Sequence, residues 1–98
     1  MILRRRFSDV VSRQLTFFAE DEADGLLAEV RRRKAIYDGA DRDDSEELYG
    51  DYVDSVDAVR DALEEMRDRF ENTLADDARE EYETAFDRAA RKRWRWLG

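Results

Sequence analysis

The sequence predicts an all-α fold, an antiparallel three-helix bundle in which a long helical hairpin is followed by a shorter third helix. The chain has no proline and only four glycines, so it lacks the residues that usually punctuate β-sheet proteins. Apolar residues recur at steps of three and four, which is the period of an amphipathic helix. The 98 residues fit a single domain, residues 1–98, and a hydrophobic content of 42% is too high for a disordered tail.

The first helix is predicted over residues 9–38. Ser8 is a suitable N-cap, and Asp9 suits the positive end of the helix. Gly39 is a natural residue to follow the last turn. Because a glycine inside a helix costs about 1 kcal/mol relative to alanine, a break near Gly25 is the alternative to one long helix. The apolar face carries Val11, Leu15, Phe18, Leu26, Val30 and Tyr37.

The second helix is predicted over residues 44–73 and the third over residues 77–96. The second begins among Asp43, Asp44 and Ser45, which all favour helix caps. Its apolar positions follow a heptad-like pattern: Leu48, Tyr52, Val56, Val59, Leu63, Met66, Phe70 and Leu74. The third helix begins with a capping-box pattern formed by Asp77 and Glu80. Its apolar face carries Tyr82, Phe86 and Ala89.

Short connections between the helices predict antiparallel neighbours. Folding the first two helices about the turn between them places Arg33 near Asp51. The apolar pairs expected from the same register are Phe18 with Met66, Leu15 with Phe70, Val11 with Leu74, and Val30 with Val53. Each of the two longer helices would span roughly 45 Å, which is long for a compact domain. A homodimer is therefore predicted, covering apolar side chains beside the seams: Phe17, Leu27, Tyr49 and Val53.

Missing residue types exclude several classes of function. Without cysteine there is no disulfide, thiolate metal site or thiol nucleophile, and without histidine the commonest general base is absent. We therefore predict no catalytic residue and no cofactor, and expect the protein not to be an enzyme.

No apolar run reaches the length of about 18 residues that a membrane span needs. The N-terminal segment MILRRRFSDVV does not have the pattern of a secretory signal, so a cytoplasmic location is expected.

Residues 38–52, DGADRDDSEELYGDY, carry acidic side chains at alternate positions, as calcium-binding loops do. Counted from Asp41, the first, third and fifth positions of an EF-hand loop would hold suitable oxygen ligands. Position 6 is Glu46, where the sharp turn needs glycine, and position 12 is Tyr52, where a bidentate glutamate is needed. We interpret the stretch as a turn followed by capping and first-turn anions, and predict no metal ligand.

Two glutamates, Glu22 and Glu29, fall inside the apolar stripe of the first helix. Di-iron sites in helical bundles combine glutamates with Glu-x-x-His motifs, and this chain has no histidine. We expect Glu22 and Glu29 to flank the apolar face and to pair with arginines. A metal-binding protein that uses carboxylates alone is the least favoured functional alternative.

The C-terminal segment RKRWRWLG interleaves basic residues with two tryptophans. Basic residues suit a helix C-terminus, and folding the third helix back on the second brings Trp96 close to Tyr52 and Trp94 close to Val56. Packing on the bundle is therefore preferred over self-association or a protein partner, and both over nucleic acid or lipid binding. The predicted interaction surface consists of Tyr49, Tyr52, Val53, Trp94 and Trp96.

Charge is unevenly distributed along the chain, whose net charge is −8. Residues 1–34 carry +2, residues 35–87 carry −15 and residues 88–98 carry +5. The acidic middle would repel phosphates, so nucleic acid is not the expected partner.

The sequence predicts a non-enzymatic helical protein that acts by self-association or by binding another protein. The alternative is an acidic decoy that imitates nucleic acid toward a DNA-binding protein. Sixteen of the 18 basic residues are arginine, as is typical of GC-rich bacterial genomes.

Overall fold

The computed structural model describes residues 6–98, which form four α-helices and a final 3-10 turn: α1 (Ser8–Asp21), α2 (Leu26–Asp38), α3 (Ser45–Glu71), α4 (Asp76–Arg93) and η2 (Arg95–Leu97). No strand occurs in this part of the chain, so the all-α prediction is confirmed. None of these helices is both long enough and apolar enough to cross a membrane. Residues 1–5, the start of the segment compared with secretory signals, lie outside the described residues.

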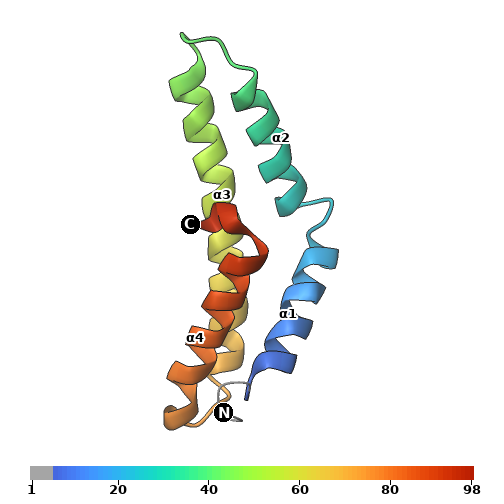
Figure 1. The fold of residues 1–98 in the computed structure, drawn as a ribbon, viewed down its shortest axis with the longest axis vertical. Coiled ribbons are helices and arrows are strands. Elements are labelled where there is room, and N and C mark those ends of the chain that lie inside the picture. Colours follow the sequence, from blue (N-terminus) through green and yellow to red (C-terminus); the bar gives the residue numbers. More distant parts are fainter. Residues whose placement is uncertain (1–5) are drawn as a thin grey trace.

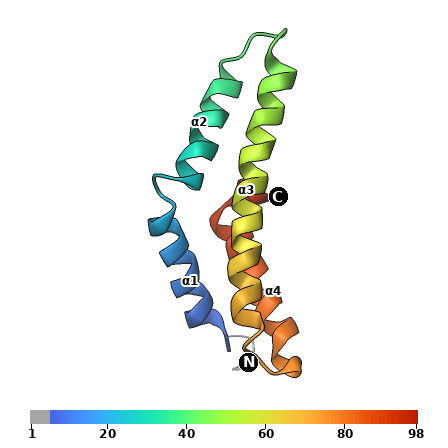
Figure 2. The ribbon, with the colours of Figure 1, turned by 180° about the vertical axis from the view of Figure 1, so that it is seen from behind.

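The molecule is a rod organised around α3, its longest helix (Figures 1 and 2). α2 lies antiparallel along the first half of α3, and α1 and α4 lie beside the second half. The rod measures 51 × 24 × 21 Å and has a radius of gyration of 15.9 Å, against about 13 Å for a compact domain of this size. Four α-helices thus stand where the sequence predicts three: α1, α3 and α4 lie in one half of the rod, and α2 and α3 form a two-helix hairpin in the other.

The predicted first helix is divided into two helices by residues 22–25. The prediction of one helix over residues 9–38 is wrong, and the alternative of a break near Gly25 is right. The Glu22 carboxylate accepts a hydrogen bond from the Leu26 backbone N–H at 3.0 Å and so caps the start of α2. Gly25 leaves room for this carboxylate, because a Cβ there would lie 2.6 Å from Glu22 Oε1. Glu22 was expected to pair with an arginine, and it caps a helix instead.

The remaining helix ends correct several predicted caps. The N-caps of α1 and α4 are Phe7 and Ala75 rather than Ser8 and Asp77, and neither forms a side-chain capping hydrogen bond. Asp44 is the N-cap of α3, within the predicted range, also without such a bond. α4 ends before the tryptophans, and a 3-10 turn replaces the last turn of the predicted third helix. The calcium-like stretch, residues 38–52, is the turn that joins α2 to α3 followed by the first two turns of α3, as interpreted from the sequence.

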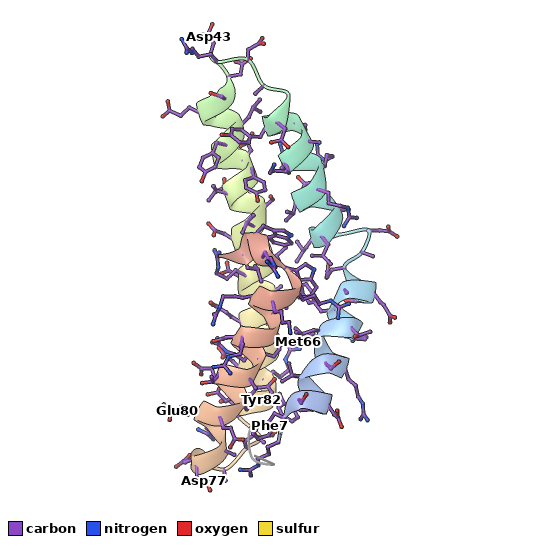
Figure 3. The ribbon with its side chains drawn as sticks, viewed as in Figure 1. Phe7, Asp43, Met66, Asp77, Glu80 and Tyr82 are labelled. Carbon is purple, nitrogen blue, oxygen red and sulfur yellow. The ribbon has the colours of Figure 1, made fainter. Side chains whose placement is uncertain are left out.

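The hydrophobic core is centred in the half of the rod that contains α1 and α4, and it extends to Leu27 and Val30 of α2. Tyr82 has no exposed surface, and Phe86 is 1% exposed. The Tyr82 ring centroid lies 5.5 Å from that of Phe7 and 4.8 Å from that of Phe70. The Tyr82 hydroxyl donates a hydrogen bond to Gln14 Oε1 at 2.8 Å, which ties α4 to α1. Burial raises the pKa of Tyr82 to about 12, so the hydroxyl stays a donor at neutral pH. Figure 3 shows Phe7 and Tyr82 close together.

The predicted register is observed where α2 meets α3. Arg33 Nη1 lies 3.7 Å from Asp51 Oδ2, which is the predicted ion pair. α1 packs mainly on α4 instead of α3, so the pairing of Phe18 with Met66 and its neighbours is not the main contact of α1. Phe18 packs edge-to-face on Trp94, with ring centroids 5.7 Å apart.

Candidate interaction surface

The part of the rod next to the turn between α2 and α3 has no interior. We call residues 31–54 the distal hairpin; in Figure 3, Asp43 marks its tip and Asp77 lies at the opposite end of the rod. None of the residues of the distal hairpin is buried. The distal hairpin nonetheless carries six large apolar or aromatic side chains: Ile36, Tyr37, Leu48, Tyr49, Tyr52 and Val53. Two helices alone do not enclose these side chains, so part of each stays in contact with water.

Three of these side chains form a tyrosine cluster, made of Tyr37, Tyr49 and Tyr52. The ring centroids of Tyr37 in α2 and Tyr49 in α3 lie 5.3 Å apart, and those of Tyr49 and Tyr52 lie 6.3 Å apart. Both distances are in the range of favourable aromatic pairs. Tyr49 remains 50% exposed. The tyrosine cluster therefore joins α2 to α3 and also presents an aromatic face to solvent.

A groove of about 300 Å³ lies at the base of the distal hairpin. Trp96 and Tyr52 both line this groove, so the predicted approach of Trp96 to Tyr52 is observed. Val30 and Ala35 add apolar lining from α2. The C-terminal turn thus extends the aromatic surface of the tyrosine cluster toward the middle of the rod.

Charge divides the distal hairpin between its two helices. Residues 31–38 carry four basic side chains and one acidic side chain, whereas residues 41–54 carry seven acidic side chains and one basic side chain. Within the part of the chain that the structure describes, Asp51 is the only acidic residue of 41–54 that forms an ion pair. The start of α3 therefore presents an unbalanced negative surface beside a basic helix.

The charged side chains of α2 are held by local pairs. Glu29 accepts hydrogen bonds from Arg32 Nη2 at 2.7 Å and from Arg33 Nε at 2.8 Å, as the sequence predicts for this glutamate. The bond from Arg32, and then that from Arg33, hold the pKa of Glu29 below its ordinary value. Lys34 Nζ lies 2.8 Å from Asp38 Oδ2, and this hydrogen bond raises the pKa of Lys34. These pairs hold the charged side chains of α2 against one another on the surface of the same helix.

Four of the five residues predicted to form an interaction surface lie in or beside the distal hairpin, and the fifth does not. Tyr49, Tyr52 and Val53 lie in the distal hairpin, and Trp96 lies at its base. Trp94 packs on a phenylalanine of α1, and the Arg93 guanidinium lies 5.4 Å from its ring centroid; its predicted approach to Val56 stays a prediction. Trp94 therefore contributes to packing between helices and not to the surface of the distal hairpin.

Ile36 and Tyr37 also belong to this surface, although they were not predicted to be part of an interaction surface. Tyr37 continues the apolar stripe of the first predicted helix and was assigned to its core face. The core does not extend so far, because Val30 is the last buried residue of α2. The spacing of apolar residues in the sequence does not show where the core ends, because that depends on how far α4 runs alongside α3.

A carboxylate pair, Glu71 at the end of α3 and Glu83 in α4, is the most unusual acid–base feature. Burial raises the pKa of Glu71, and the neighbouring carboxyl group of Glu83 raises it further, whereas Arg67 lowers it. Glu71 Oε1 is buried and has no donor among the described residues, and a proton shared with Glu83 would supply one. Across residues 6–98, no three acidic residues are arranged to hold a metal ion.

Glu71→Gln is expected to stabilise the protein near neutral pH. A carboxyl group whose pKa is raised by folding stabilises the folded state at a pH below its pKa in the unfolded chain, which is about 4.3. This stabilisation is lost as the pH rises through the pKa of the group in the folded chain. Glutamine imitates the protonated form and can donate to Glu83. Thermal melts should show a higher Tm than wild type at about pH 7 and a similar Tm at about pH 4. Glu64→Gln is the control with the same change in charge on the same helix; a Tm at neutral pH below wild type for Glu71→Gln would contradict the prediction.

No family model, no curated protein and no solved structure matches this chain.

Proposed function

We propose that the protein is a non-enzymatic helical interaction protein that forms a homodimer through its distal hairpin. The observation that supports this most strongly is the absence of any buried residue in residues 31–54, a segment with six large apolar or aromatic side chains. Apolar surface gains about 25 cal/mol for each Å² removed from water. In a two-fold interface each copy contributes the same patch, so the apolar surface of each chain is covered by that of the other.

Charge favours a second copy as the occupant of this surface. The basic side chains of residues 31–38 and the unpaired acidic side chains of residues 41–54 lie on neighbouring helices. When two such hairpins pack about a two-fold axis, α2 of each copy can lie against α3 of the other, which brings opposite charges together twice. Tyrosine and tryptophan are the side chains most often found at the energetic centre of interfaces, and Tyr49 and Trp96 are placed to serve there.

The second candidate, an acidic decoy of nucleic acid, has weaker support. Exposed carboxylates do follow one side of α3: Asp57, Asp61, Glu64, Glu65 and Asp68. Three of them are paired with arginines of the same helix, in the pairs Asp57 with Arg60, Glu65 with Arg69 and Asp68 with Arg67. These arginines reduce the negative field that a DNA-binding protein would meet, so we prefer the dimer.

Two single substitutions in different halves of the rod test the proposed interface. Tyr49 in the distal hairpin is 50% exposed, and Phe17 on α1 is 60% exposed, so each can be replaced by alanine without opening the core. We expect Tyr49→Ala to raise the dimer Kd by about tenfold or more, because it removes an interface anchor worth at least about 1.4 kcal/mol. Phe17→Ala should leave the Kd unchanged. Sedimentation equilibrium measures both values.

Either of two results would exclude this interface. One is a wild-type chain that remains monomeric at about 1 mM, since a weaker association has no use as an interaction surface at ordinary protein concentrations. The other is a dimer that Phe17→Ala weakens and Tyr49→Ala does not, which would move the interface to the end of the rod that carries α1. Circular dichroism of both variants should match wild type, because both side chains are exposed.

A further inference from the structure

We propose that the groove between α1 and α4 binds a small amphiphile with an anionic head and an unbranched apolar tail, of the class of medium-chain carboxylates. The groove has a volume of about 450 Å³, within the usual range of small-molecule sites. It is formed by the half of the rod that holds the core, away from the distal hairpin. The proposal therefore does not depend on the dimer.

The floor of the groove is apolar and open. Val11 and Leu15 of α1 are each 2% exposed and line the groove together with Ala85 and Ala89 of α4. The two alanines are four residues apart, so they lie one above the other on the same face of α4. Ala85 and Ala89 are half-buried, and because neither has a side chain large enough to fill the space above Val11 and Leu15, an apolar strip along α4 stays open to an unbranched tail.

The α4 side of the groove carries three cations, Arg88, Lys92 and Arg93. Among residues 6–98, none of the three forms an ion pair with a carboxylate. Arg93 donates a hydrogen bond to Thr16 Oγ1 at 3.3 Å and lies over the Trp94 ring, contacts that leave its positive charge unbalanced. Unpaired cations beside buried apolar surface favour a ligand that has both an anionic and an apolar part.

The α1 side of the groove carries two hydroxyl groups and no charge. Ser8 and Ser12 are exposed, four residues apart, and line the groove opposite the cations. Both hydroxyls can donate hydrogen bonds to an anionic head. No acidic side chain of the described residues lines the groove, although the whole chain has 26 acidic residues and a net charge of −8. The groove is thus a local exception to the negative surface that would otherwise repel an anion.

Calorimetric titration of the wild-type chain with octanoate, decanoate and dodecanoate, each below its micellar concentration, tests both parts of the ligand. We expect the affinity to rise by up to about fourfold for each added methylene, because each enters the apolar floor. Dodecylammonium has the same tail with a cationic head and should not bind. A free amphiphile and a membrane lipid share this chemistry, so phosphatidylglycerol vesicles form a separate arm and should bind more weakly than dodecanoate.

Two double variants with the same change in net charge locate the head. Arg88→Gln with Lys92→Gln removes two cations of the groove, whereas Arg91→Gln with Arg95→Gln removes two exposed cations of the same segment that do not line it. The first should raise the Kd for dodecanoate by about tenfold or more, since charged hydrogen bonds are lost, and the second should change it by less than about twofold.

Two blocking variants locate the tail. Ala89→Leu fills the groove from α4, and Ser12→Leu fills it from an exposed position on α1, where folding is not at risk. Each should weaken dodecanoate binding while thermal melts show a folded chain. The proposal is overturned if wild type does not bind dodecanoate, if both double variants lose affinity equally, or if affinity does not depend on chain length. It is also overturned if vesicles bind more tightly than dodecanoate and Ser12→Leu has no effect.

Discussion

Phe86→Ala is expected to lower the free energy of unfolding by about 3–5 kcal/mol. Phe86 is 1% exposed, and its ring centroid lies 6.0 Å from that of Tyr82 at the centre of the core. The substitution removes buried apolar surface and leaves a cavity that the neighbouring helices can only partly close. Because domains of this kind are stable by only about 5–15 kcal/mol in total, the variant should unfold at a much lower urea concentration than wild type.

The matched control for Phe86→Ala is Ile36→Ala in the distal hairpin. Ile36 is 38% exposed, so its truncation should cost less than about 1 kcal/mol. Both substitutions are best measured in a Tyr49→Ala background, in which monomers are compared. A similar cost for Phe86→Ala and Ile36→Ala would mean that the distal hairpin has an interior of its own, and the basis of the proposed dimer interface would be lost.

Removal of residues 94–98 is expected to lower the free energy of unfolding by an amount on the order of 5 kcal/mol. Leu97 is 6% exposed, and the Arg60 guanidinium donates a hydrogen bond to its carbonyl oxygen. Burial of one leucine contributes about 1.5–3 kcal/mol, and the two half-buried tryptophans add a similar amount by packing on α1 and at the base of the distal hairpin. The C-terminal segment therefore fastens three helices to one another, and the shortened chain should be close to its unfolding transition.

Urea denaturation checks the truncation, and its m-value should fall because less surface is exposed on unfolding. Arg95→Ala is the control within the same segment, since Arg95 is exposed and its loss should change the free energy of unfolding by no more than about 0.5 kcal/mol. If the shortened chain is as stable as wild type, the segment is not packed on the helices, and the basic tryptophan-rich segment becomes available for nucleic acid or lipid.

The period of the apolar residues determined the helices of this protein and most of their ends. The second predicted helix, residues 44–73, corresponds to α3 at Ser45–Glu71, because a heptad-like pattern without proline leaves one local structure. The short turn that follows Asp38 determined the register of α2 on α3, as the Arg33–Asp51 pair shows. These properties depend on residues within a few turns of one another, so they can be predicted from the sequence.

The tertiary structure decided which helix faces meet and where the core stops. The sequence allowed both a continuous and a broken first helix, and the cap that Glu22 forms on α2 distinguishes them. α4 accompanies only the second half of α3 (Figure 1), so Tyr37 and Tyr52 are not buried although they continue apolar stripes. The groove between α1 and α4 joins Ser8 and Ser12 to cations near the other end of the chain. A helix face is a local property of its residues, whereas the contact between two faces depends on the packing of the whole chain.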